Sequence, residues 1–141
     1  MPIEFIRNPE GTIAVAYCFG ELSEADISNS ISFAFGSGQA EPGLDRIVTF
    51  DPATKLHELD TTALRSIQRR VLEFERRNGR EACFRSVLVY SSPMQQHLMQ
   101  LYKAIWDELG LPGVEFFVVA SEEEAWKLLD SVPLALRRGA D

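Results

Sequence analysis

The sequence predicts a single-domain α/β fold with a mixed, mostly parallel sheet and an N-terminal hairpin. A chain of 141 residues, 45% hydrophobic and 25% charged, is enough for one globular domain with its own core. Apolar runs of strand length alternate with segments of helical period, in the order ββαβαβαβα. Strands joined through helices are normally parallel, because the right-handed crossover returns the chain in the same direction. We expect one domain over residues 1–132 and a loose tail over residues 133–141.

The first part of the chain is expected to form a hairpin and a helix. Residues 3–7 and 12–19 have strand patterns and flank the turn Asn8-Pro9-Glu10-Gly11. The segment Ser23-Glu24-Ala25-Asp26 is a variant capping box, so a helix should begin at Ser23. The run Gly36-Ser37-Gly38 should end that helix.

The middle of the chain predicts a buried strand, an irregular segment and a helix. Residues 47–50 form a short continuous apolar run, which is typical of a strand buried on both faces. Residues 51–59 have no period. A helix should then run from Asp60 to about Asn78-Gly79. Its apolar positions have helical spacing and predict the buried face: Leu64, Ile67, Val71 and Phe74.

The last part of the chain predicts two further strands, each followed by a helix. Residues 87–90 and 114–119 have strand composition. A helix should start at Ser91-Ser92-Pro93, and the last helix at the capping box Ser121-Glu122-Glu123-Glu124. The expected buried positions of the first of these helices are Met94, Leu98, Leu101, Ile105 and Leu109.

The bulk composition limits the function. A formal net charge of −7 disfavours a general binder of nucleic acid or of anionic membranes. Cys18 and Cys83 are far apart in sequence and form neither a metal motif nor a disulfide framework, which favours two reduced core residues. No apolar run approaches the ~18 residues of a membrane span, and the N-terminus lacks a signal-peptide pattern. We therefore expect a cytoplasmic protein without a metal or cofactor.

Three short motifs occur in the predicted order at suitable spacing. Gly20-Glu21-Leu22 follows the second strand, Asp60-Thr61-Thr62-Ala63-Leu64 opens the second helix, and residues 121–129 form an acidic cap followed by Ala and Leu. Together they resemble the STAS domain family over residues 3–129, in its divergent SpoIIAA-like branch of anti-sigma-factor antagonists. The resemblance implies a non-enzymatic regulatory module that binds a protein partner.

The resemblance also implies a site at the start of the second helix. Thr62 matches the family's phosphoacceptor, and Asp60 matches the family's aspartate. The sequence has Thr where the family has Ser, and Ala63 where it has Gly. The implied partner is an anti-sigma factor with serine-kinase activity, docking on Asp60, Thr61, Ala63, Leu64, Arg65 and Arg69. The residues themselves equally predict that Thr62 is a helix-capping or first-turn threonine with only a structural role.

Arginine is concentrated in the predicted second helix and at its exit. Acidic residues are interspersed with them, which favours a solvated face with salt bridges. A docking patch for an acidic or phosphorylated partner is the alternative. The arginines are Arg65, Arg69, Arg70, Arg76, Arg77, Arg80 and Arg85, and the interspersed acids are Glu73, Glu75 and Glu81.

The two histidines offer weaker signals. His57 and Glu58 precede the helix that carries Thr62, so they are either loop residues or part of a nucleophile–base set. His97 lies among apolar residues of the third helix and is expected to be a helix surface or packing residue. Neither histidine has the companions of a metal site.

A ligand site is the runner-up hypothesis. Ser91 and Ser92 open a helix at the carboxyl end of a strand, where they either cap the helix or help to bind an anion or nucleotide phosphate. Met99, Tyr102 and Trp106 form a second apolar stripe on the same helix. That stripe predicts core packing, a dimer face or a lipid-like ligand pocket. The alternative function is thus a carrier of a nucleotide or an apolar ligand.

Overall fold

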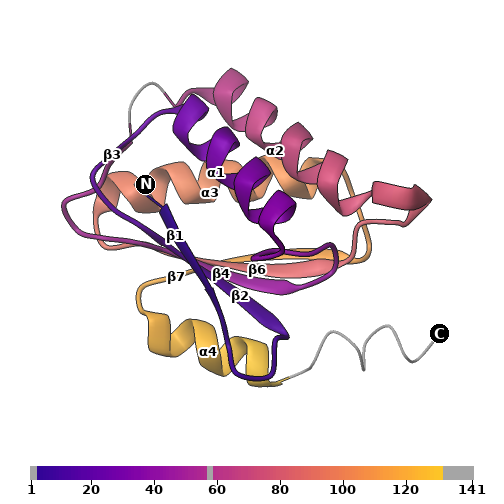
Figure 1. Cartoon of the computed structure of the whole chain (residues 1–141). Helices are drawn as coiled ribbons and strands as arrows, with labels where there is room; N and C mark the ends of the chain where they lie inside the picture. The colour runs from indigo at the N-terminus through magenta and orange to yellow at the C-terminus, as the bar shows by residue number, and fades with distance from the viewer. Residues whose placement is uncertain (1–2, 57–58, 132–141) are drawn as a thin grey trace.

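A computed structural model of the chain describes residues 3–56 and 59–131 (Figure 1). Within them a five-stranded sheet has the order β1-β2-β4-β6-β7, and β3 pairs separately with β5. The strands are β1 Ile3–Arg7, β2 Ile13–Cys18, β3 Glu21–Leu22, β4 Asp45–Phe50, β5 Lys55–Leu56, β6 Phe84–Val89 and β7 Val114–Val119. The helices are α1 Glu24–Ser37, α2 Thr61–Glu75, the 3₁₀ turn η1 Arg77–Gly79, α3 Pro93–Glu108 and α4 Glu122–Ser131. The expected tail over residues 133–141 lies outside the described residues.

The sheet confirms the predicted topology. β1 and β2 form the antiparallel hairpin, and β2, β4, β6 and β7 are parallel neighbours. The short parallel pair β3–β5 was not predicted, because two residues are too few to show a strand period. It lies just past the ends of β2 and β4, and Leu22 of this pair is fully buried.

The molecule has three layers, with α1, α2 and α3 on one face of the sheet and α4 on the other (Figure 1). The helices start where the sequence predicts. Ser23 and Asp26 form the reciprocal capping box of α1, and Gly38 ends that helix with a φ of 82°. Asp60 caps α2, and Ser92 caps α3 with Pro93 in its first turn.

The predicted buried face of α3 is confirmed at Ile105 and wrong at Met94 and Leu109. Met94 and Leu109 are 66% and 43% exposed, whereas Met99 and Trp106 are buried beside Ile105. Stacking explains the burial of Trp106, because its ring lies 4.9 Å from the Phe116 ring of β7. The stripe of Met99, Tyr102 and Trp106 is thus the side of α3 that faces the sheet.

Two charged residues are wrongly predicted to be part of a solvated face. Glu75 is 0% exposed because it follows Val71 by one helical turn and so points into the protein, where it pairs with Arg46. Arg85 is 4% exposed because it belongs to β6, not to the helix exit, and there it faces α4. Strand β4 also differs, since it begins at Asp45 and its second half is only half-buried.

Candidate functional site: an apolar cavity under the helices

A cavity of about 170 Å³ lies between the sheet and the layer formed by α1, α2 and α3. The five strands of the sheet, β5 and the helices α1, α2 and α3 all contribute to its lining, and nearly all the lining side chains are apolar. The exceptions include Glu41, Arg46, Ser86 and the hydroxyl group of Tyr102. The cavity therefore has an apolar body with a few polar groups, which is the usual make-up of a small-molecule site.

The sequence produces this cavity through small side chains on one face of the sheet. Ala14, Ala16 and Cys18 of β2 and Ser86 of β6 all line it. In addition, the backbone of α2 packs mainly against α1 and α3 rather than against the sheet. Protein interiors are normally packed as densely as organic crystals. Small side chains opposite a helix that stands away from the sheet leave space that such packing would normally fill.

The polar end of the cavity is built on β4. The Nη2 group of Arg46 donates to Glu75 Oε2 at 2.6 Å and to the carbonyl oxygen of Leu44 at 2.9 Å. Glu75 Oε1 accepts from the backbone N–H of Gly43 at 2.8 Å. The Arg46 guanidinium also lies 4.0 Å from the centre of the Phe84 ring. Both oxygens of the buried carboxylate are thus used, and the pair is neutral overall.

Tyr102 covers this end from α3. Its ring is perpendicular to that of Phe116, with centroids 5.6 Å apart. Burial raises the pKa of the Tyr102 hydroxyl to about 12, against the opposing effect of the positive charge on Arg46. Tyr102 therefore stays protonated and can donate a hydrogen bond. Cys18 also lines the cavity, and burial raises the pKa of its thiol to about 12.

The residues predicted to dock a partner lie in the first part of α2 and just before it. Some of them are exposed, and others are buried or paired within the protein. Thr61 and Thr62 are exposed in the first turn, and Asp60 Oδ1 accepts from the backbone N–H of Ala63 at 2.9 Å. Leu64 points inward and lines the cavity. Arg65 is bonded to Glu108 of α3 at 3.0 Å, and Arg69 is exposed.

The predicted ligand-pocket residues are divided as well. Met99 and Tyr102 line the cavity, whereas Ser91, Ser92 and Trp106 lie outside its lining. Ser91 Oγ donates to the carbonyl oxygen of Phe50 at 2.8 Å, and Ser92 Oγ accepts from a backbone N–H of α3. Sequence reasoning missed Arg46, Ser86 and Glu75. Two sequence features could have indicated the cavity. One is the presence of the polar residues Arg46 and Ser86 within apolar strands, and the other is the series of small residues at alternate positions of β2.

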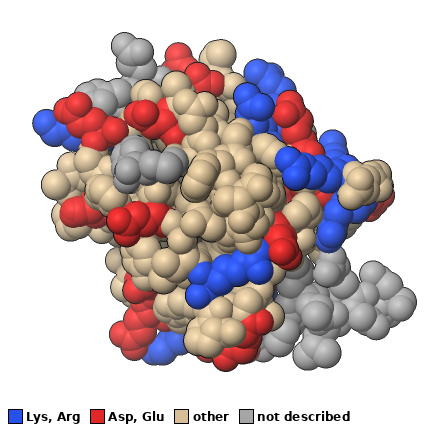
Figure 2. Space-filling model, viewed as in Figure 1, with Lys and Arg blue, Asp and Glu red and all other residues tan. Residues whose placement is uncertain are grey.

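The remaining candidates add no site. His57 and Glu58 lie outside the described residues, and His97 is exposed on α3. Among residues 3–56 and 59–131, no three His, Cys, Asp or Glu side chains are grouped to hold a metal ion. In the same residues, both cysteines are free and no helix is long and apolar enough to cross a membrane. Figure 2 shows basic side chains gathered over the end of α2, beside a largely uncharged area over α1.

Comparisons with known proteins identify the fold. The chain is similar in structure to a DUF3478-family protein with a SpoIIAA-like fold from Shewanella loihica PV-4. The two share 19% identity over 90% of this chain and 91% of the other, with a TM-score of 0.50. It is also similar to the Bacillus cell fate determinant SpoIIAA in its phosphorylated form, with 22% identity over 90% of this chain and 98% of that one and a TM-score of 0.44.

No family model matches the sequence, and no curated protein matches it either. The class is therefore set by topology: this chain has a SpoIIAA-like α/β fold, the fold of STAS domains. The resemblance seen in the sequence is confirmed at the level of the fold.

Proposed function

We propose that this chain is a non-enzymatic binding module that holds a small apolar molecule in the cavity under its helices. The observation that supports this is the cavity itself, about 170 Å³ in volume and almost wholly apolar. A molecule that fills it regains the contacts that an empty cavity loses. An engineered cavity of about 150 Å³ in another protein binds benzene, which sets the size of ligand to expect. The ligand is thus about the size of a substituted benzene ring or a short alkyl chain.

A nucleotide is a poorer fit to the same space. Its phosphates would need cations or free backbone N–H groups facing inward. Arg46 is the basic residue of the lining, and Glu75 already neutralises it. The apolar form of the carrier hypothesis is therefore the one that we retain.

The test is a titration with small apolar probes such as toluene and indole, followed by thermal unfolding and calorimetry. At a ligand concentration of about 100 times the Kd, bound ligand should stabilise the protein by about 2.7 kcal/mol. The variant Ala16→Leu places a larger side chain in the cavity and should abolish the response. Ala25→Leu is the matched control, because Ala25 is exposed on α1. Equal responses of the two variants, or no response of the wild type, would reject the proposal.

A second function is supported by a different observation, at the start of α2. The side-chain cap of this helix is Asp60, so Thr62 is not needed as a cap. The Thr62 side chain is exposed and makes no hydrogen bond to a described residue. We propose on this basis that Thr62 accepts a phosphate from a serine-kinase-type partner that docks on this edge, as the family resemblance implies. Phosphate there would change docking through its charge and its three acceptor oxygens.

Mass spectrometry of the protein isolated from its own cells tests this second proposal. The expected result is phosphate on Thr62 and none on the neighbouring Thr61, which is equally exposed and serves as the internal control. Modification of both threonines alike would indicate non-specific phosphorylation. Absence of phosphate on Thr62 under every growth condition would reject the proposal that phosphorylation of Thr62 controls docking.

A further inference from the structure

The polar end of the cavity has an excess of hydrogen-bond donors. The Nε and Nη1 groups of Arg46 and the hydroxyl of Ser86 make no hydrogen bond to a described residue. The acceptors nearby are occupied, since Glu75 accepts from Gly43 and Arg46. Donors without a protein partner outnumber free acceptors here, so this end favours a ligand atom that accepts hydrogen bonds.

Strand register places these residues side by side. Arg46 of β4 is the Cα partner of Ser86 on β6, and Ser86 is the partner of Phe116 on β7. The three residues form one row across the sheet, on the face that lines the cavity. Tyr102 of α3 lies over Phe116 and close enough to feel the charge of Arg46. The row and Tyr102 thus border the same cavity.

The charge of this end is balanced without a ligand. Arg46 contributes one positive charge, and the fully buried Glu75 contributes one negative charge. Glu41 also borders the cavity, but its side chain is 60% exposed and pairs with Arg7. A ligand carboxylate would therefore bring an uncompensated negative charge next to a buried carboxylate, which is costly in an apolar surrounding.

We infer that the cavity selects a small neutral molecule with an apolar body and one carbonyl-type acceptor, such as a ketone, aldehyde or ester. This inference rests on the proposed carrier function. The carbonyl oxygen accepts from the row of Arg46, Ser86 and Tyr102, while the apolar body lies toward the small side chains of β2. Glu75 acts as the selectivity residue, because its charge cancels the attraction of Arg46 for an anion.

The experiment compares three probes of similar size: ethylbenzene, acetophenone and benzoate. Calorimetric titration of the wild type should give acetophenone a Kd about tenfold lower than that of ethylbenzene, the gain expected of one hydrogen bond. Benzoate should bind most weakly. The variants Ser86→Ala and Tyr102→Phe should each reduce the advantage of acetophenone, measured as the ratio of the ethylbenzene Kd to the acetophenone Kd within the same variant.

Glu75→Gln is the decisive variant. Glutamine keeps an acceptor for Gly43 but removes the negative charge, so benzoate binding should strengthen by at least about tenfold. Tightest binding of benzoate by the wild type, or an unchanged benzoate Kd in a folded Glu75→Gln protein, overturns the inference. Binding of ethylbenzene decides the carrier function separately. If none of the three probes binds, the carrier function and this inference both fail.

Discussion

The two faces of the same sheet are packed in different ways. On the α4 side, Val15, Ile47 and Val87 are 0–1% exposed and pack against Ala125 and Leu129. On the side of the three helices, Phe84 and Phe116 pack against Trp106, but the small residues of β2 border a cavity of about 170 Å³. The α4 side of the sheet is therefore densely packed, whereas part of the side covered by α1, α2 and α3 is loosely packed and has space for a ligand.

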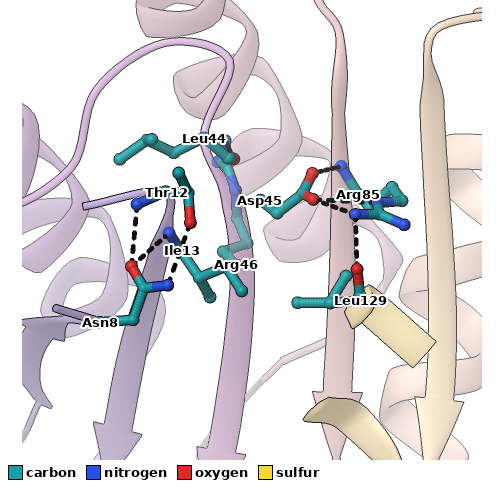
Figure 3. Close-up of polar contacts among 8 residues, drawn as sticks. All are labelled: Asn8, Thr12, Ile13, Leu44, Asp45, Arg46, Arg85 and Leu129. Atoms are coloured by element: carbon teal, nitrogen blue, oxygen red, sulfur yellow. Dashed lines mark hydrogen bonds and ion pairs between the residues drawn. The ribbon is translucent and has the colours of Figure 1, made fainter. Parts of the chain in front are cut away.

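The buried ion pairs of the two faces repeat this contrast. Asp45 and Arg46 are consecutive in β4 and serve opposite faces. On the α4 side, Asp45 accepts from the backbone N–H and the Nε of Arg85 at 3.0 and 2.9 Å, and Arg85 also donates to Leu129 (Figure 3). On the cavity side, Arg46 keeps donors that no described residue uses. The first pair ties β4, β6 and α4 together, and the second leaves donors for a ligand.

The largest expected effect is on the α4 side. Replacing Asp45 with Ala removes the carboxylate that pairs with Arg85, a residue that is only 4% exposed. We expect a loss of about 3–5 kcal/mol in the free energy of unfolding, measured with urea. Arg65→Ala breaks an exposed ion pair with Glu108 and should cost about 1 kcal/mol or less. Losses of equal size would mean that the Asp45–Arg85 pair does not hold this face together.

The packing contrast predicts opposite signs for one substitution. Ala125→Leu inserts atoms into the dense face, where Ala125 is 0% exposed, and should cost about 1–3 kcal/mol. Ala16→Leu inserts the same atoms beside the cavity and should gain about 0.5–2 kcal/mol. Thermal unfolding of both variants measures the difference. If Ala16→Leu destabilises the protein as much as Ala125→Leu, the cavity side has no spare space.

The sequence was sufficient for features that depend on local chemistry. Capping residues such as Ser23 and Asp60 mark helix starts because they satisfy backbone groups within one turn. The parallel order of β4, β6 and β7 follows from the helices between them. These rules need no knowledge of which residues meet across the core.

The features that the sequence did not reveal depend on distant partners. Glu75 is buried only because Arg46 and Gly43, some thirty residues earlier, meet it. The orientation of α3 is decided by Phe116 of β7, since the helix is apolar over a wide arc. The cavity depends on how far α2 stands from the sheet, and neither propensity nor periodicity records that distance.

The stability of the protein should depend on pH through the Cys18 thiol, which lines the cavity. Burial raises the pKa of Cys18 to about 12, so the folded state holds this proton more tightly than the unfolded chain, whose thiol has a pKa near 9. The resulting stability is complete below the unfolded pKa and is lost as pH rises from about 9 toward 12. We expect a loss of about 1 kcal/mol per pH unit in that window.

Urea unfolding between pH 8 and 11 measures this loss. Tyr102 contributes in the same direction, because its pKa is also raised to about 12. Cys18→Ala should flatten the curve, whereas a substitution of the other cysteine, the half-buried Cys83, should serve as the control. Identical slopes for wild type and Cys18→Ala would show that Cys18 is not sealed from water.

The smallest effect on stability is expected at the start of α2, outside both faces. Thr62 is exposed there, two residues before Leu64, which lines the cavity. A negative charge at a helix N-terminus is stabilising by about 0.3–1 kcal/mol, so Thr62→Asp should unfold at or slightly above the wild-type temperature. Thr62→Ala should stay within about 0.5 kcal/mol of wild type, because Asp60 provides the cap.

Partner binding, in contrast, should separate these two variants. If the edge at Thr62 docks a kinase-like partner, Thr62→Asp should bind it less well and Thr62→Ala should bind it constitutively. A pull-down with each variant, using Thr61→Asp as the matched control, measures this. The same variants should bind toluene as the wild type does, because Thr62 does not line the cavity. Loss of toluene binding in Thr62→Asp would instead couple the two sites, through the turn of α2 that joins Thr62 to Leu64, and would make phosphate a regulator of the cavity.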